Sequence, residues 1–171
     1  MYSANVVEHQ LETKENTMVY IFLPMILFAI DFIAKEYIEV TYKEHETKNI
    51  CKDKIQIKKV YNKGAMLNVL DHRPEFVAGL STGMVAVLII GYIQLLAKQG
   101  YHLLKIALGL VIGGGLGNVF DRLKRKKVVD FFSFRVKNEK IKHTVFNLAD
   151  IFVFLGGVIF IIYSILPSKK K

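Results

Sequence analysis

The stretch FVAGLSTGMVAVLIIGYIQLLA, residues 76–97, contains 22 residues and no charge. A helix of about 20 apolar residues is long enough to cross the hydrocarbon core of a bilayer. Similar apolar blocks cover residues 18–35, 101–120 and 147–166, and charged residues fill the segments between them. A soluble domain of 171 residues could not bury every face of four such helices. The pattern predicts a mainly α polytopic membrane protein with four transmembrane helices.

The two long segments between these blocks differ in character. Residues 36–75 contain TKNICKDKIQIKKVYN, residues 47–62, in which apolar and polar residues alternate around three β-branched positions. This alternation predicts a small β-rich extracytoplasmic subdomain between helices 1 and 2. Residues 121–146 are strongly basic, with KRKK at 124–127, and are expected to form an extracytoplasmic loop.

The N-terminal residues 1–17 carry three glutamates against one lysine. A cleavable signal peptide needs a basic first region, so this segment is interpreted as a short leader without structure. Met18 is an alternative start, and the choice between Met1 and Met18 stays open. The whole chain, residues 1–171, is expected to form a single membrane domain.

The cysteine and histidine content argues against a metal site. Cys51 is the one cysteine, and the five histidines are scattered without the spacing of a metal motif. The glycine-rich GGGLGN at 113–118 does not fit the GxGxxG pattern, and no strand precedes it. We therefore expect no metal, no cofactor and no nucleic-acid partner.

Four aspartates lie at the boundaries of the expected spans: Asp31, Asp121, Asp130 and Asp150. Because successive spans run in opposite directions, all four fall on one face of the membrane. Three asparagines fall on the same face: Asn62, Asn118 and Asn147. Asp130 and Asp150 each precede apolar residues, and two carboxylates in such a site cannot both ionise easily. One acid and one base result, which is the chemistry of peptide hydrolysis by an aspartyl dyad.

Two other classes of function compete with an enzyme. A small transporter or channel subunit could use Asp31, Asp121 and Asp150 as a path for cations or protons. That function predicts acids spread through the membrane depth, whereas these acids gather at one interface. An assembly factor could bind partner helices through a stripe of small residues, but this leaves the paired aspartates unexplained. The stripe consists of Gly109, Gly113 and Gly117.

Four motifs occur in a distinctive order. They are NKGAM (62–66), GGGLGNVFDR (113–122), KVVDFF (127–132) and FNLAD (146–150). As a set they resemble the bacterial lipoprotein signal peptidase family, signal peptidase II. In the first apolar block, IDFIAKEY resembles the same family through Asp31 and Lys35. The similarity covers roughly residues 30–157.

The resemblance implies an aspartyl endopeptidase of the bacterial cytoplasmic membrane. Such an enzyme cleaves diacylglyceryl-modified prolipoproteins before the lipidated cysteine, so these substrates and membrane lipids are the implied partners of a monomer. Asp130 and Asp150 match the catalytic pair. The remaining matched positions bind substrate or support the site: Asn62, Gly64, Asn118, Asp121, Arg122, Asn147, Asp31 and Lys35.

The resemblance and the charge pattern disagree on orientation. Most of the 24 lysines and arginines lie in the two long loops, so a count of basic residues would place these loops in the cytoplasm. The family has its active site on the outer side, and this orientation is the one we expect. Four residues depart from the family's usual motifs and bear on substrate selectivity: Met66, Asn68, Gly115 and Ile151.

Overall fold

The computed structural model describes residues 2–44, 46–64, 72–136 and 144–166, with side chains from residue 17 onward. Its elements follow one another as α1 (Tyr2–Thr41), β1 (Thr47–Ile50), β2 (Ile55–Asn62), α2 (Pro74–Leu96), α3 (His102–Arg125), β3 (Val128–Phe134) and α5 (Leu148–Ile165). Each of the four helices contains a segment long and apolar enough to cross a membrane. The polytopic α-helical fold expected from the sequence is therefore confirmed.

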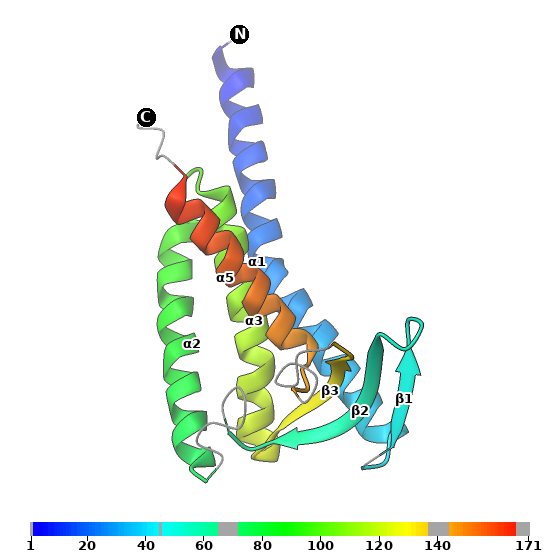
Figure 1. Ribbon diagram of the computed structural model, residues 1–171. Helices are drawn as coiled ribbons and strands as arrows, with labels where there is room; N and C mark the ends of the chain where they lie inside the picture. Colours follow the sequence, from blue (N-terminus) through cyan, green and yellow to red (C-terminus); the bar gives the residue numbers. More distant parts are fainter. Residues whose placement is uncertain (1, 45, 65–71, 137–143, 167–171) are drawn as a thin grey trace.

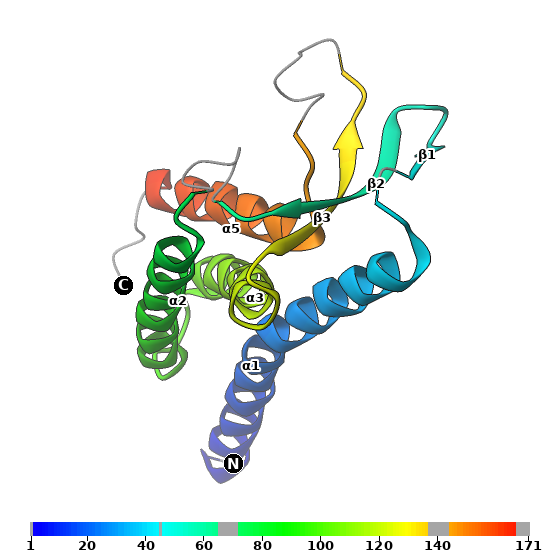
Figure 2. The same cartoon turned by 90° about the horizontal axis from the view of Figure 1, so that it is seen from below.

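Helix α3 is the centre of the bundle. It packs against α1, α2 and α5, and the view along the bundle shows it surrounded by the other three (Figure 2). The three-stranded sheet lies at one end of the bundle, while the start of α1 and the end of α5 lie at the other (Figure 1). The parity of four spans, inferred from the sequence, agrees with this arrangement.

The sheet is antiparallel and has the strand order β1-β2-β3. Its third strand comes from the segment 121–146, where the sequence analysis suggested a basic loop and no strand. Strand β3 is buried along nearly its whole length, and its apolar residues do not alternate with polar ones. A strand covered on both faces lacks the period-two signal that identified β2.

Two helices run beyond the apolar blocks that predicted them. Helix α1 ends at Thr41 instead of near residue 35, and α3 ends at Arg125 instead of near residue 120. Charged residues in these extensions pair between the helices, as Arg125 does with Glu36, so the helices need no apolar continuation. At the other end, residues 2–17 form the first part of α1, although the sequence suggested a leader without structure.

Pro24 lies inside α1 and has no backbone N–H for the carbonyl of Tyr20, four residues earlier. The hydroxyl of Tyr92 on α2 donates to that carbonyl oxygen at 2.8 Å. Tyr92 is 4% exposed, so the carbonyl is satisfied without water. Helix α1 continues through the proline and changes direction along its length (Figure 2).

The glycine stripe of α3 faces α1. A Cβ atom at Gly109 would lie 2.8 Å from Leu23, and one at Gly113 would lie 2.8 Å from Leu27 and 3.0 Å from the carbonyl oxygen of Pro24. The Leu23 side chain could shift to admit a Cβ atom at Gly109, but Gly113 faces the Pro24 backbone and the Leu27 Cβ atom, so this position requires glycine at the present helix separation. The stripe therefore packs α3 inside this chain.

Candidate active site

The ten predicted site residues meet at the sheet end of α3. Five elements and the turns beside them supply these residues, and each is joined to another member by a hydrogen bond or an ion pair. Helix α1 carries Asp31 and Lys35; α3 carries Asn118, Asp121 and Arg122; β3 carries Asp130; and the start of α5 carries Asn147 and Asp150. Strand β2 ends at Asn62, and Gly64 follows it.

Asp150 lies in the first turn of α5. The helix begins with a capping box, in which Asn147 Oδ1 accepts the backbone N–H of Asp150 at 2.9 Å and Asp150 Oδ2 accepts the backbone N–H of Asn147 at 3.1 Å. The other oxygen, Oδ1, accepts Nδ2 of Asn118 at 3.0 Å. An ionised carboxylate is an acceptor only, and the positive end of the helix dipole adds to these two donors.

Asp130 occupies the middle of β3 and is 3% exposed. Its Oδ1 accepts Nδ2 of Asn147 at 2.7 Å, and its Oδ2 accepts Nδ2 of Asn62 at 3.1 Å. Burial, followed by the negative charge of Asp150, raises the pKa of Asp130, whereas the hydrogen bonds from Asn62 and Asn147 and the charge of Lys35 lower it; the net result is a pKa of about 7. Near neutral pH, Asp130 therefore exists in both its protonated and its ionised form.

Asn147 connects the two aspartates. Its side-chain amide nitrogen donates to Asp130 Oδ1 and to Asn118 Oδ1, the latter at 3.1 Å, while its oxygen and its backbone N–H bind Asp150. One residue thus fixes both carboxyl groups. Asp130 is buried and Asp150 is half-buried. An acid and a base held by one residue can deliver a proton to one atom while removing a proton from another.

Arg122 links α3 to the segment after β2. Its guanidinium donates to the carbonyl oxygen of Gly64 at 3.0 Å and to the carbonyl oxygen of Asn118 at 3.3 Å. Among the described residues, its buried Nε has no hydrogen-bond partner. Arg122 thus ties Gly64, two residues after Asn62, to α3.

The departures from the family motifs fall in different places. Met66 and Asn68 lie outside the described residues. A Cβ atom at Gly115 would lie 2.8 Å from Val85 on α2, so glycine at this position permits a closer approach of α2. Ile151 packs against the buried cluster beside β3.

The pairing of Arg125 with two acids was not foreseen from the sequence. Arg125 donates to Asp121 Oδ1 at 2.9 Å and also pairs with Glu36 on α1. Its partner Asp121 lies one helical turn earlier, a spacing that could have suggested the pair. Glu36 lies 89 positions away, and no signal in a single sequence connects it to Arg125.

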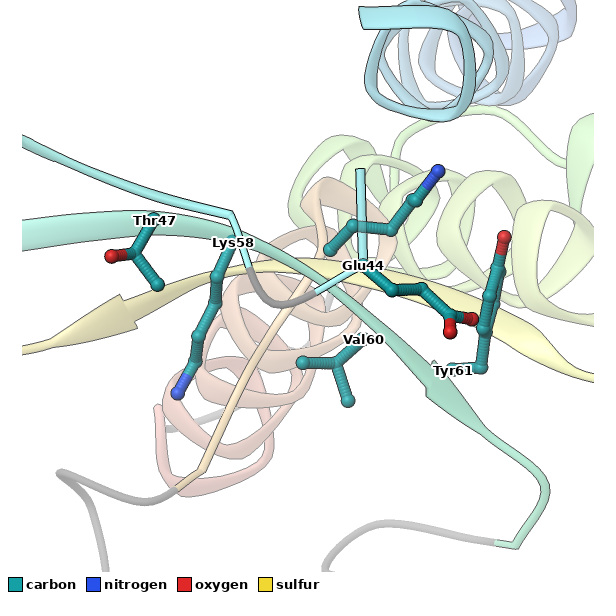
Figure 3. Close-up of a pocket in the computed structure, with 6 residues that line it drawn as sticks. Glu44, Thr47, Lys58, Val60 and Tyr61 are labelled. Carbon is teal, nitrogen blue, oxygen red and sulfur yellow. The ribbon is translucent and has the colours of Figure 1, made fainter. Parts of the chain in front are cut away.

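A separate pocket of about 470 Å³ lies beside β2, and none of the predicted site residues lines it. Six residues do: Glu44, Thr47, Lys58, Lys59, Val60 and Tyr61. The Glu44 carboxylate approaches the Tyr61 ring, and Lys58 points away from both (Figure 3). The Tyr61 hydroxyl donates to Glu39 at 2.8 Å. Burial, followed by this contact with Glu39, raises the pKa of Tyr61 to about 12.

The described part of the chain contains no group of three or more histidine, cysteine, aspartate or glutamate side chains that could hold a metal ion. That the protein needs no metal and no cofactor stays a prediction.

Comparisons with known proteins agree on the family. The profile of signal peptidase (SPase) II matches residues 23–166. The lipoprotein signal peptidase of Clostridium tetani is 35% identical over 116 residues, which are 68% of this chain and 72% of that protein. The lipoprotein signal peptidase of Moorella thermoacetica is 30% identical over 154 residues, which are 90% of this chain and 97% of that protein.

The fold has a solved counterpart. A bacterial membrane enzyme determined at 2.3 Å resolution superposes with a TM-score of 0.74 at 21% identity, covering 90% of this chain and 93% of that chain. A second structure, at 1.9 Å resolution, has a TM-score of 0.72. The agreement in four-helix fold and the match of the family profile over most of the sequence lead to one conclusion: this chain belongs to the signal peptidase II family of membrane peptidases.

Proposed function

We propose that this protein is an aspartyl endopeptidase that removes signal peptides from diacylglyceryl-modified prolipoproteins by cleaving before the lipidated cysteine. The observation that carries the proposal is the bridge that Asn147 makes between Asp130 and Asp150 in a buried site. The names of the relatives, which are lipoprotein signal peptidases, support the substrate class.

The proposed reaction uses the two aspartates in different protonation states. Asp150 accepts a proton from a water molecule, which attacks the carbonyl carbon of the scissile peptide bond. Protonated Asp130 gives its proton to the carbonyl oxygen, so a neutral tetrahedral intermediate forms. The intermediate then returns a proton from its hydroxyl group to Asp130, while Asp150 gives its proton to the leaving nitrogen, which departs as an amine. Both aspartates end in the state in which they began.

The remaining site residues serve binding and support in this proposal. Asn118 and Asn147 hold the carboxyl groups, and Asn62 orients Asp130. Gly64 and Arg122 hold the segment that the substrate would pass. In this proposal the active site opens on the outer side of the bacterial cytoplasmic membrane, as the family resemblance implies. It lies at the interface, because a lipid-anchored substrate cannot leave the bilayer. We expect the protein to be a monomer, and its chain to form a single membrane domain.

The direct test is cleavage of a lipidated prolipoprotein by the purified protein in detergent. Mass spectrometry should locate the new N-terminus at the lipidated cysteine. The matched control is the same precursor without the diacylglyceryl group, which should stay intact. Failure to cleave a lipidated precursor that another signal peptidase II does cleave would refute the proposal.

A further inference from the structure

Lys35 on α1 is 1% exposed, although it carries a charge. Its ammonium nitrogen lies 2.7 Å from Asp31 Oδ2 and 3.2 Å from Asp121 Oδ2, and it donates to Asn118 Oδ1 at 3.0 Å. The ammonium group thus forms two ion pairs with buried carboxylates and one hydrogen bond with an amide oxygen. The reaction proposed above uses neither the lysine nor its two carboxylates.

One of these carboxylates reaches the start of α5. Asp31 Oδ1 accepts the backbone N–H of Ala149 at 2.9 Å, and Ala149 directly precedes Asp150. Ala149 and Asp31 are each 0% exposed, so water cannot replace this contact. A Cβ atom at Gly117 would overlap Asp31 Oδ2, which shows that glycine is needed here to leave space for the carboxylate.

The other carboxylate reaches β3 in the same manner. Asp121 Oδ2 accepts the backbone N–H of Val129 at 3.2 Å, and Val129 directly precedes Asp130. Val129 is 0% exposed and Asp121 is 1% exposed. Each carboxylate paired with Lys35 therefore holds the main chain one residue before a proposed catalytic aspartate.

We propose that Lys35 is a positioning residue that sets the separation of Asp130 and Asp150 by holding β3 and α5 to one point on α1. Lys35 also binds Asn118 Oδ1, which turns the amide nitrogen of Asn118 toward Asp150. Buried ion pairs contribute little to stability compared with well-packed apolar residues. The geometry of the lysine and its two carboxylates thus serves the precision of the site. This inference rests on the proposed function.

The test separates positioning from charge balance. Lys35→Met alone would leave an uncompensated buried charge, so the informative variant is Lys35→Met/Asp31→Asn. The amide oxygen introduced by Asp31→Asn can still accept the Ala149 N–H, and Asp121 keeps its ion pair with Arg125 at 2.9 Å. The hydrogen bonds to the backbone N–H groups of Ala149 and Val129 can therefore still form, but the ammonium group that connects their two acceptors is lost.

We expect this double variant to fold with a melting temperature close to that of the natural protein. Its kcat for a lipidated prolipoprotein should fall on the order of 10- to 100-fold, because a displacement of about 1 Å at a catalytic group has this effect. KM should stay nearly unchanged, since neither residue is assigned to substrate binding. A kcat equal to that of the natural protein would overturn the proposal.

Amide hydrogen exchange gives a readout that does not depend on catalysis. Peptides covering 128–131 and 147–151 should exchange faster in the double variant, whereas peptides from α2 should not. Unchanged exchange in both segments would overturn the positioning role of Lys35, even if the natural protein cleaved no lipidated substrate and the proposed function failed.

Lys105→Met is the matched control. Lys105 is also buried, at 4% exposure, and its ammonium donates to the carbonyl oxygen of Lys98 at 2.6 Å near the opposite end of α3. This variant should leave kcat and the exchange of both site segments unchanged. Equal effects of Lys105→Met on both segments would show a general response to losing a buried lysine and would also overturn the proposal.

Discussion

Strand β3 and the first turn of α5 each contribute an aspartate to the site, but the surroundings of the two aspartates differ. On β3, Asp130 is buried in a sheet whose dipoles nearly cancel, and its pKa is raised to about 7. On α5, Asp150 accepts backbone and side-chain N–H groups at the positive end of a helix. Burial on β3 and a helix N-terminus on α5 thus provide different electrostatic environments for two identical residues. Substitutions at both aspartates and their neighbours can show whether this difference assigns their roles.

The largest effect is expected when either aspartate loses its ability to transfer protons. Asp130→Asn and Asp150→Asn should each lower turnover by at least ~100-fold, because asparagine keeps the size but neither accepts nor releases the proton. The double variant should be little worse than either single one, since the two residues act as a unit. A gel-shift assay on a lipidated precursor measures this.

Asp121→Asn and Asp53→Asn are the comparison variants for that assay. Asp121 binds Val129 and Lys35 but is not assigned a proton transfer, so measurable activity should remain. Asp53 is exposed in the turn between β1 and β2, so Asp53→Asn should leave the activity unchanged. Appreciable cleavage by Asp130→Asn or by Asp150→Asn would contradict the assignment of the dyad.

The asparagines offer a finer comparison. Asn147→Ala removes the bridge to Asp130 and the N-cap of α5. Asn62→Ala removes one hydrogen bond to Asp130 and the one that Asn62 accepts from the backbone N–H of Gly64. We expect a larger loss of kcat for Asn147→Ala, and additionally a loss of stability of about 1 kcal/mol from the missing cap. Kinetics and thermal unfolding in detergent measure both. A milder effect of Asn147→Ala than of Asn62→Ala would show that the bridge is unimportant.

Asp130 should also make stability depend on pH. Because its pKa is higher in the folded protein than the ordinary value of 3.8, folding favours the protonated form. The free energy of unfolding should then fall as the pH rises from about 4 to 7, by up to about 4 kcal/mol. Asp130→Asn removes this dependence, so its melting temperature relative to the natural protein should be higher at pH 8 than at pH 5. The same relative melting temperature at both pH values would show that Asp130 is not perturbed as described.

The glycine stripe of α3 affects the position of Asp150 on α5 more than that of Asp130 on β3. Gly117→Leu would displace Asp31, which holds Ala149 next to Asp150, while Gly113→Leu would separate α3 from α1 farther from the site. Both variants should melt at a lower temperature in detergent, by several degrees, with the greater loss of activity for Gly117→Leu. If both keep the natural melting temperature and full activity, the stripe does not pack as described.

The last prediction concerns the side of the membrane on which the sheet lies, and it requires no substitution. Cys51 is exposed in the turn that joins β1 to β2, in the same sheet as β3. A thiol reagent that cannot cross membranes should label Cys51 on intact cells. Protection until the cells are lysed, with labelling of the denatured protein as the control, would place Asp130 on the cytoplasmic side.

The sequence was a good guide to the helices because each long apolar block reports a span directly. It was a poor guide to β3, because a strand buried on both faces shows no alternation. The motif set named Asp31 and Lys35, but their contacts with Ala149 and Asp121 join positions far apart in the chain. Such contacts depend on how helices pack, and periodicity in one sequence carries no information about that.

The position of α5 has a consequence for biosynthesis. Asn147 and Asp150 begin the last described span, whereas Asp130 and Lys35 belong to parts of the chain that are made earlier. A nascent chain that has inserted α1, α2 and α3 therefore carries one of the two aspartates and lacks the residue that bridges them. The proposed pair of aspartates is therefore complete only after residue 150 has been synthesised and α5 has entered the bilayer.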